Sequence, residues 1–220
     1  MKKQKREKKY NYFWHDFVWV LAYLLGLLWF RPKNYYISEE AKQKINGGAL
    51  VIANHVGFYD PVYMMMSLNY RRQHFVATKE LFSNRLKKFL FEKIFLCISV
   101  DREGSGLSTV RSVINVLSEG EVVSLFPEGH INIENKNGIN AFKSGVVLMA
   151  LKSGCPIIPM YIQKRKNIFK RQVTIYGNPI KVDPSNTDMP IVDYINTVST
   201  TIREKEIELE EYYKKITNKR

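Results

Sequence analysis

The chain of 220 residues has few cysteines and few acidic residues. Its two cysteines, Cys97 and Cys155, are too few for a disulfide framework, and no Cys or His spacing is typical of a metal site. Both lie in apolar runs, so we expect them to be buried and reduced, in a reducing compartment. The 21 acidic residues are outnumbered by 34 lysines and arginines, which gives a net charge of +13. This excess favours an anionic partner: a nucleic acid, an anionic membrane surface or a phosphorylated substrate.

The sequence also has no uncharged run as long as a typical membrane-spanning helix. The uncharged run of residues 17–30 has fourteen residues, which extend about 21 Å as a helix against a hydrocarbon core of about 30 Å. Six basic residues lie among the first nine, and no small-x-small cleavage site follows the run, which disfavours a secretory signal peptide. Trp19, Tyr23 and Trp29 suit the headgroup boundary. We therefore expect residues 1–33 to associate with a membrane as a helix in one leaflet; the alternatives are a spanning helix and a buried core helix.

Beyond Pro32, short apolar strands alternate with helices. The strands are apolar on both faces, which indicates an α/β fold with a mostly parallel sheet covered by helices. No internal repeat or long linker interrupts residues 34–220, so we expect one domain there. The predicted strands are residues 49–53, 74–78, 96–100, 122–126, 157–162 and 173–176, and the predicted helices are residues 61–69, 84–95, 108–119, 142–153 and 188–216.

The predicted strand at residues 49–53 runs towards His55 and, five positions later, Asp60. A continuous helix would place these side chains about 140° apart, so they meet only if the chain turns between them. Gly57 allows such a turn, and Asp60 before Pro61 has the pattern of a helix N-cap. An Asp that accepts a hydrogen bond from one imidazole nitrogen leaves the other nitrogen free to take a proton. The pair is therefore a candidate for base catalysis, although a helix cap alone would also explain Asp60.

Two further predicted strands end next to charged residues. Glu128 and Gly129 follow the strand at residues 122–126, and Arg102 follows the strand at residues 96–100. Guanidinium is a planar fork suited to phosphate, and glycine lets a ligand approach the backbone closely. Working residues of parallel sheets gather at the carboxyl ends of the strands. We therefore expect the His–Asp pair, Arg102 and Glu128 at one sheet edge, with a solvated surface arginine as the alternative for Arg102.

The order of these motifs resembles that of the glycerophospholipid acyltransferase family, above all the 1-acylglycerol-3-phosphate acyltransferases. The resemblance spans residues 49–160, about half of the chain, and its most specific part is His-x4-Asp followed by Phe-Pro-Glu-Gly. The matching segments are Asn54-His55-x4-Asp60-Pro61, Lys79-Glu80-Leu81-Phe82, Val100-Asp101-Arg102, Phe126-Pro127-Glu128-Gly129, Phe142-Lys143-x-Gly145 and Pro156-Ile157-Ile158-Pro159.

The resemblance implies a membrane-interface enzyme of phospholipid biosynthesis, with residues 34–220 as the acyltransferase domain, at the cytoplasmic face of the cell membrane. His55, with Asp60 as its partner, would activate the free hydroxyl of 1-acylglycerol-3-phosphate, and the product would be phosphatidic acid. The donor would be acyl-CoA or acyl carrier protein, with no cofactor. The implied substrate-binding residues are Lys79, Arg102, Glu128, Gly129 and Lys143.

One departure from the family pattern concerns the acceptor. The family usually follows Phe-Pro-Glu-Gly with Thr-Arg-Ser, whereas this chain has His130-Ile131-Asn132. The phosphate contact of that arginine is either lost or supplied by a nearby residue such as Lys136 or Lys143. The expected acceptor is still 1-acylglycerol-3-phosphate, and another lysolipid or hydroxyl lipid is the alternative. His130 is either a ligand contact or an inert loop residue.

Three other classes of protein are disfavoured. Gly104-Ser105-Gly106 lies between a strand and a helix as in a dinucleotide-binding loop, but Thr109 replaces the third glycine and the usual acidic residue about twenty positions on is missing. The basic stretches at residues 2–9 and 164–171 would suit nucleic acid, but no binding module accompanies them. We therefore expect no nucleic-acid partner. A lipid-binding relative without catalysis is disfavoured because His55 and Asp60 are both present.

Overall fold

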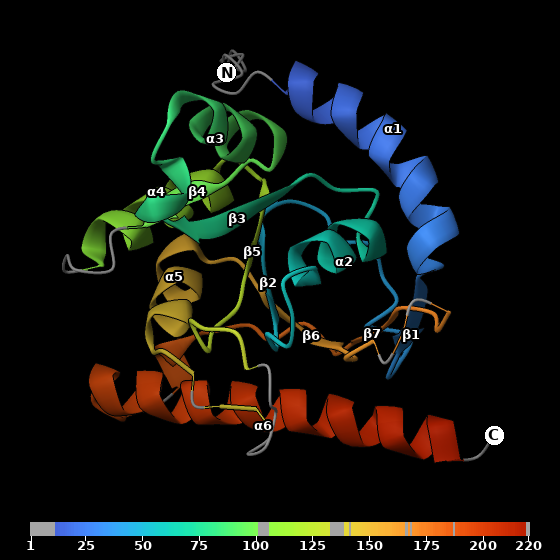
Figure 1. Cartoon of the computed structure of the whole chain (residues 1–220). Coiled ribbons are helices and arrows are strands. Elements are labelled where there is room, and N and C mark those ends of the chain that lie inside the picture. The colour runs from blue at the N-terminus through green and yellow to red at the C-terminus, as the bar shows by residue number, and fades with distance from the viewer. Residues whose placement is uncertain are drawn as a thin grey trace, which may run out of the picture.

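The computed structural model describes residues 12–100, 106–132, 139–140, 142–165, 167, 169–186 and 188–218. A seven-stranded, mostly parallel sheet with helices around it confirms the predicted α/β class (Figure 1). The strands are β1 (Lys33–Tyr36), β2 (Ala49–Ala53), β3 (Gln73–Thr78), β4 (Ile98–Val100), β5 (Val122–Leu125), β6 (Ile157–Ile162) and β7 (Val173–Tyr176). The helices are α1 (Phe13–Phe30), α2 (Asp60–Ser67), α3 (Arg85–Phe89), α4 (Leu107–Ser118), α5 (Gly145–Ser153) and α6 (Ile191–Asn218).

The strand order brings the two predicted catalytic loops together. The order is β1-β7-β6-β2-β5-β3-β4, and the pairs are parallel apart from the antiparallel β6 and β7. Near the end of the central strand β2, Ile52 lies opposite Leu125 at the end of β5. The loops that leave these two strands therefore start side by side at the carboxyl edge of the sheet, which is the arrangement expected of a parallel sheet.

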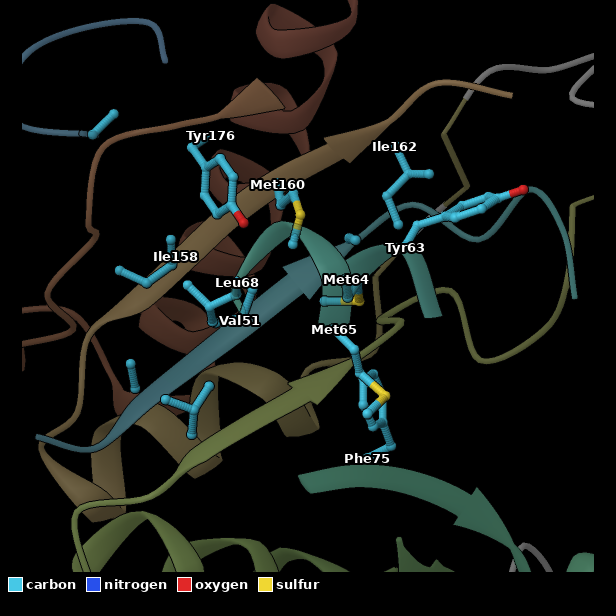
Figure 2. Packing of buried hydrophobic residues seen from close by; sticks show 14 of the residues in the cluster. Val51, Tyr63, Met64, Met65, Leu68, Phe75, Ile158, Met160, Ile162 and Tyr176 are labelled. Atoms are coloured by element: carbon cyan, nitrogen blue, oxygen red, sulfur yellow. The ribbon is translucent and has the colours of Figure 1, made fainter. Parts of the chain in front are cut away.

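The sheet is buried on both faces. Successive side chains of β2 point to opposite sides of the sheet, and all of them are buried. Val51 and its neighbours pack against Met64 and Met65 of α2 and against Leu68, which directly follows α2, and these side chains cover one face of the sheet (Figure 2). Leu50 packs with side chains of α4, α5 and α6 on the other face. Burial on both sides explains why these strands are continuous apolar runs in the sequence.

Helix α1 begins earlier than the uncharged run and lies along the outside of the domain (Figure 1). Most of its apolar side chains are exposed, while His15 and Gly26 are buried. Gly26 is needed for close contact with α2, because a Cβ atom there would lie 2.6 Å from the sulfur of Met66. Within the described residues, α1 is the one helix long and apolar enough to cross a membrane. The boundary between residues 33 and 34 stays a prediction.

Several predicted boundaries differ from the structure. The helix expected at residues 84–95 is α3 followed by a π-helical turn, Leu90–Ile94, and the side chain of Asn84 caps α3 by accepting from the Lys87 N–H at 2.8 Å. Ser108 does not cap α4, which follows Gly106. Strand β1 was not predicted, because its sequence is half-buried and partly polar. The free cysteines Cys97 and Cys155 are half-buried, and burial raises the pKa of the Cys97 thiol to about 12, which makes it unreactive.

Candidate active site

The loop after β2 starts from a fixed point. Asn54 is buried, and its side-chain amide pairs with the backbone of Ile162 in β6, accepting from the N–H at 2.7 Å and donating to the C=O at 3.0 Å. The side chain thus extends the ladder between β2 and β6 by one step. Because a buried amide with both partners is strongly held, the next residue, His55, leaves the sheet in a defined direction.

His55 and Asp60 meet as predicted. His55 Nδ1 lies 2.8 Å from Asp60 Oδ2, and the His55 side chain is 15% exposed while that of Asp60 is almost fully buried. The imidazole stacks on the ring of Phe126, with 4.0 Å between ring centroids and 13° between planes. Since the carboxylate accepts, Nδ1 carries the hydrogen and Nε2 is the nitrogen that can take a proton.

The helix-cap explanation of Asp60 is wrong. Asp60 is the first residue of α2, and its side chain turns back into the loop instead of capping the helix. There Oδ2 accepts from the backbone N–H groups of Val56 at 2.7 Å and Gly57 at 2.8 Å, in addition to His55. Gly57 does not have a positive φ, so the turn itself does not require glycine. Three donors on one oxygen hold the Asp60 side chain in place and fix the loop around it.

The loop after β5 places the side chain of Glu128 against the backbone of His55. Glu128 is buried, and its Oε1 accepts from the His55 backbone N–H at 3.0 Å. Its Oε2 accepts from the side-chain amide of Asn140 at 2.7 Å and from the Asn140 backbone N–H at 3.3 Å. Both carboxylate oxygens are thus engaged by the protein. The role of Glu128 in substrate binding stays a prediction, while the structure gives it a role in joining two loops.

Gly129 and Lys143 also come together. Gly129 has a φ of 75°, and a Cβ atom there would lie 2.9 Å from both Cε and Nζ of Lys143. A residue other than glycine would therefore be strained and would displace the lysine. The Lys143 backbone N–H donates to Pro127 O at 3.2 Å, and its side chain is exposed. The structure thus places the positive charge of Lys143 next to Gly129.

The other predicted residues are less completely placed. Lys79 is exposed in the 3-10 turn Lys79–Phe82 that follows β3, at the same sheet edge. Arg102 and Lys136 lie outside the described residues. His130 is exposed, with Nε2 3.4 Å from Asn140 Nδ2. Two contacts were not predicted from the sequence. One is the stack of His55 on Phe126, for which the place of Phe126 in the same motif as Glu128 was a signal, and the other is the bond of Asn140 to Glu128, for which the sequence holds no signal.

Comparison with known proteins decides the family. Residues 17–163, more than half of the chain, match the model of the family described as Acyltransferase. This chain belongs to the acyltransferase family. Among its relatives, the 1-acyl-sn-glycerol-3-phosphate acyltransferase of Bacillus subtilis is 30% identical over 140 residues, which are 61% of this chain and 68% of the relative. The enzyme of the same name from Streptococcus pneumoniae is 26% identical over 207 residues, covering 87% of this chain and 75% of that one.

The acyltransferase fold is also found in a solved structure. The 1-acyl-sn-glycerophosphate acyltransferase PlsC of Thermotoga maritima superposes with a TM-score of 0.62 at 17% identity, covering 90% of this chain and 81% of that one. At this identity the likeness concerns the fold alone. The family match and the named relatives make this acyltransferase an enzyme that transfers an acyl group to oxygen, and they confirm the family resemblance seen in the motifs.

Proposed function

We propose that this acyltransferase moves a fatty acyl group from a thioester to the free hydroxyl of 1-acylglycerol-3-phosphate, giving phosphatidic acid for phospholipid biosynthesis. The observation that carries the proposal is the buried Asp60 carboxylate 2.8 Å from His55 Nδ1, which leaves Nε2 as a proton acceptor. The names of the relatives from Bacillus subtilis and Streptococcus pneumoniae support the acceptor. Another lysolipid or hydroxyl lipid is the second candidate, because His130-Ile131-Asn132 replaces the usual Thr-Arg-Ser.

The proposed reaction needs one base and no cofactor. Nε2 of His55 takes the proton of the acceptor hydroxyl while the oxygen attacks the thioester carbonyl. The imidazolium that forms is stabilised by Asp60. The tetrahedral intermediate then collapses, the carbon–sulfur bond breaks, and the imidazolium returns its proton to the departing thiolate. The N–H groups of Val56 and Gly57 are already bound to Asp60, so the oxyanion draws its donors from other groups.

Positive charge near this site supports a phosphorylated acceptor. The Lys143 ammonium lies over Gly129, beside the turn that carries Glu128. Lys79 follows β3 at the same edge, and the resemblance adds Arg102 after β4. Glu128 and Gly129 belong to this proposed site by the same resemblance. The proposed thioester carrier is coenzyme A or acyl carrier protein.

We further propose that α1 anchors the enzyme in one leaflet, at the cytoplasmic face of the cell membrane. Ten large apolar side chains of α1 are exposed: Phe13, Trp14, Phe17, Val20, Leu21, Leu24, Leu25, Leu27, Leu28 and Trp29. Polar contacts nevertheless dock the helix sideways on the domain. His15 Nδ1 donates to Ile94 O at 2.6 Å, and Arg72 makes two bonds to the Asp16 carboxylate, at 2.7 and 2.9 Å. A helix held along its side by such groups suits an interfacial position better than a spanning one.

The catalytic loop reaches towards the same apolar side. Phe58, between His55 and Asp60, is 80% exposed. The neighbouring Tyr59 contacts Phe30 at the end of α1, with 6.3 Å between ring centroids. An anchored α1 would therefore hold the loop at the lipid surface, where the acceptor and the product reside.

Transfer by the purified enzyme tests this proposal. Wild type in detergent is incubated with palmitoyl-CoA or palmitoyl acyl carrier protein and 1-acylglycerol-3-phosphate, and both thiol release and lipid product are measured. His55→Ala is expected to lower transfer by at least about 100-fold, because a general base contributes that much. Glu211→Gln, at an exposed position of α6, serves as the control. Wild-type turnover in His55→Ala would refute the base, and thiol release without phosphatidic acid would refute the acceptor.

The anchor is tested by fluorescence. All three tryptophans, Trp14, Trp19 and Trp29, lie in α1, so the emission of the intact protein reports on this helix. We expect a blue shift with vesicles that contain anionic lipid, and quenching by brominated acyl chains at shallow depth. Unchanged emission would refute the anchor.

A further inference from the structure

The buried carboxylate of Glu128 acts on the backbone of His55. Its Oε1 accepts from the His55 N–H at 3.0 Å, while Asn132 donates from its backbone to His55 O at 2.7 Å. The ring is held separately by Asp60 and Phe126. The position of the proposed base therefore depends on Glu128 as well as on Asp60.

Glu128 is held in turn by Asn140. The amide of Asn140 donates to Oε2 at 2.7 Å and its backbone N–H donates at 3.3 Å. Another acid, Glu206 of α6, lies close enough to Glu128 to interact with it electrostatically. Removing the amide would leave a buried carboxylate oxygen poorly paired beside a second acid, which favours movement of Glu128.

Helix α6 holds the segment that carries Asn140. Arg203 Nε lies within hydrogen-bond distance of two backbone carbonyl oxygens, Ile139 O at 2.9 Å and Asn140 O at 3.2 Å. A guanidinium bonded to consecutive carbonyls fixes the direction of that backbone. The contacts form a continuous series from Arg203 through Asn140 and Glu128 to the His55 N–H.

We propose that Asn140 and Arg203 are positioning residues, which hold the backbone of His55 in place through Glu128. The inference rests on the proposed role of His55 as the base and assigns to the C-terminal helix a part in the reaction. Neither residue belongs to the motifs that identify the family. A base displaced by a fraction of an ångström loses turnover while the binding of both substrates is retained.

The test combines kinetics with hydrogen exchange. Asn140→Ala and Arg203→Met are expected to lower kcat by about 10- to 100-fold with little change of either KM, because positioning of the base affects the transition state. Arg203→Lys keeps the charge and is expected to recover part of the loss. Because both variants act on one series of contacts, the double variant is expected to lose little more than the worse single variant. Lys205→Met is the matched control on α6, since Lys205 pairs with Glu208 at the surface.

Hydrogen exchange of the peptide that contains His55 gives a readout without activity. Its backbone N–H is expected to exchange faster in Asn140→Ala and Arg203→Met, and unchanged in Lys205→Met. Wild-type kcat together with unchanged exchange would overturn the inference. A fall in melting temperature with unchanged kcat per folded molecule would also overturn it, as this would show a structural role only. Failure of the proposed function is distinct, because His55→Ala would then remain active whatever the two positioning variants do.

Discussion

Glu206 carries a stability cost that depends on pH. It lies on the buried face of α6, and within the described structure neither carboxyl oxygen has a hydrogen-bond partner. Burial raises the pKa of Glu206 well above its ordinary value of 4.5, and the nearby Glu128 raises it further. The folded protein therefore keeps a proton on Glu206 that the unfolded chain releases above about pH 4.5.

The sign and size of the effect follow from this difference in bound protons. Because the folded state holds the extra proton, stability is highest below the unfolded pKa and falls as the pH rises towards the folded pKa. One proton costs about 1.4 kcal/mol of unfolding free energy per pH unit. Glu206→Gln removes the titration while nearly keeping the shape. We therefore expect the difference in melting temperature between Glu206→Gln and wild type to grow with pH. For a domain of this size, the increase is roughly 3–6 °C for each pH unit above the unfolded pKa.

Thermal unfolding followed by far-ultraviolet circular dichroism at pH 5, 6 and 7 checks this expectation. Tryptophan emission is unsuitable, because it reports on α1 alone. Glu211→Gln, an exposed acid on the same helix, is the control and should show no pH-dependent gap. If the difference in melting temperature between Glu206→Gln and wild type were constant across this pH range, Glu206 would be ionised in the folded protein. A lower melting temperature at every pH would mean that its carboxylate has a partner. Either result would refute the reasoning.

Three further predictions concern the site, the core and the anchor. Phe126→Leu should lower kcat by about 10-fold in steady-state assays, because the imidazole loses the ring that orients it; an unchanged kcat would show the stack to be incidental. Burial lowers the pKa of His74 to about 4, so the folded state loses stability relative to the unfolded state as the pH falls from 6.5 towards 4. In acid denaturation, His74→Gln should therefore lose roughly 3 kcal/mol less unfolding free energy than wild type over this range, and equal acid sensitivity would contradict the assignment. Leu24→Glu with Leu28→Glu should release the protein from sedimenting vesicles without unfolding the domain, whereas continued sedimentation would place the anchor elsewhere.

The sequence predicted the buried parts of the fold best. The bounds of β2, β6 and β7 agree with the prediction, because each is a short apolar run between polar or turn-forming residues. Strand β1 was not predicted, because Lys33 and Asn34 leave no apolar pattern in its sequence. Its place at the edge follows from pairing with β7, which no local signal indicates.

The candidate site was predictable in two respects: the contact within one motif, and the meeting of the β2 and β5 loops at one sheet edge. His55 and Asp60 lie within one loop, so a turn between them was enough to bring them together. The direction of the Asp60 side chain was misjudged, because an Asp at a helix start can cap forwards or turn back to the preceding loop. The contact of Arg203 with Ile139 and Asn140 spans more than sixty positions in sequence and depends on the docking of α6. Such long-range contacts come from tertiary packing, which periodicity and spacing do not encode.

The edge position of β1 has a consequence for the order of events during synthesis. Asn34 of β1 lies opposite Thr174 of β7, and these residues are separated by 140 positions. During synthesis, α1 and β1 therefore emerge long before β7, the strand that pairs with β1. Strands so far apart in sequence pair slowly, because a long loop must close before they meet. If α1 reaches the lipid first, the bilayer confines that end, and the sheet completes its edge against a surface instead of in free solution.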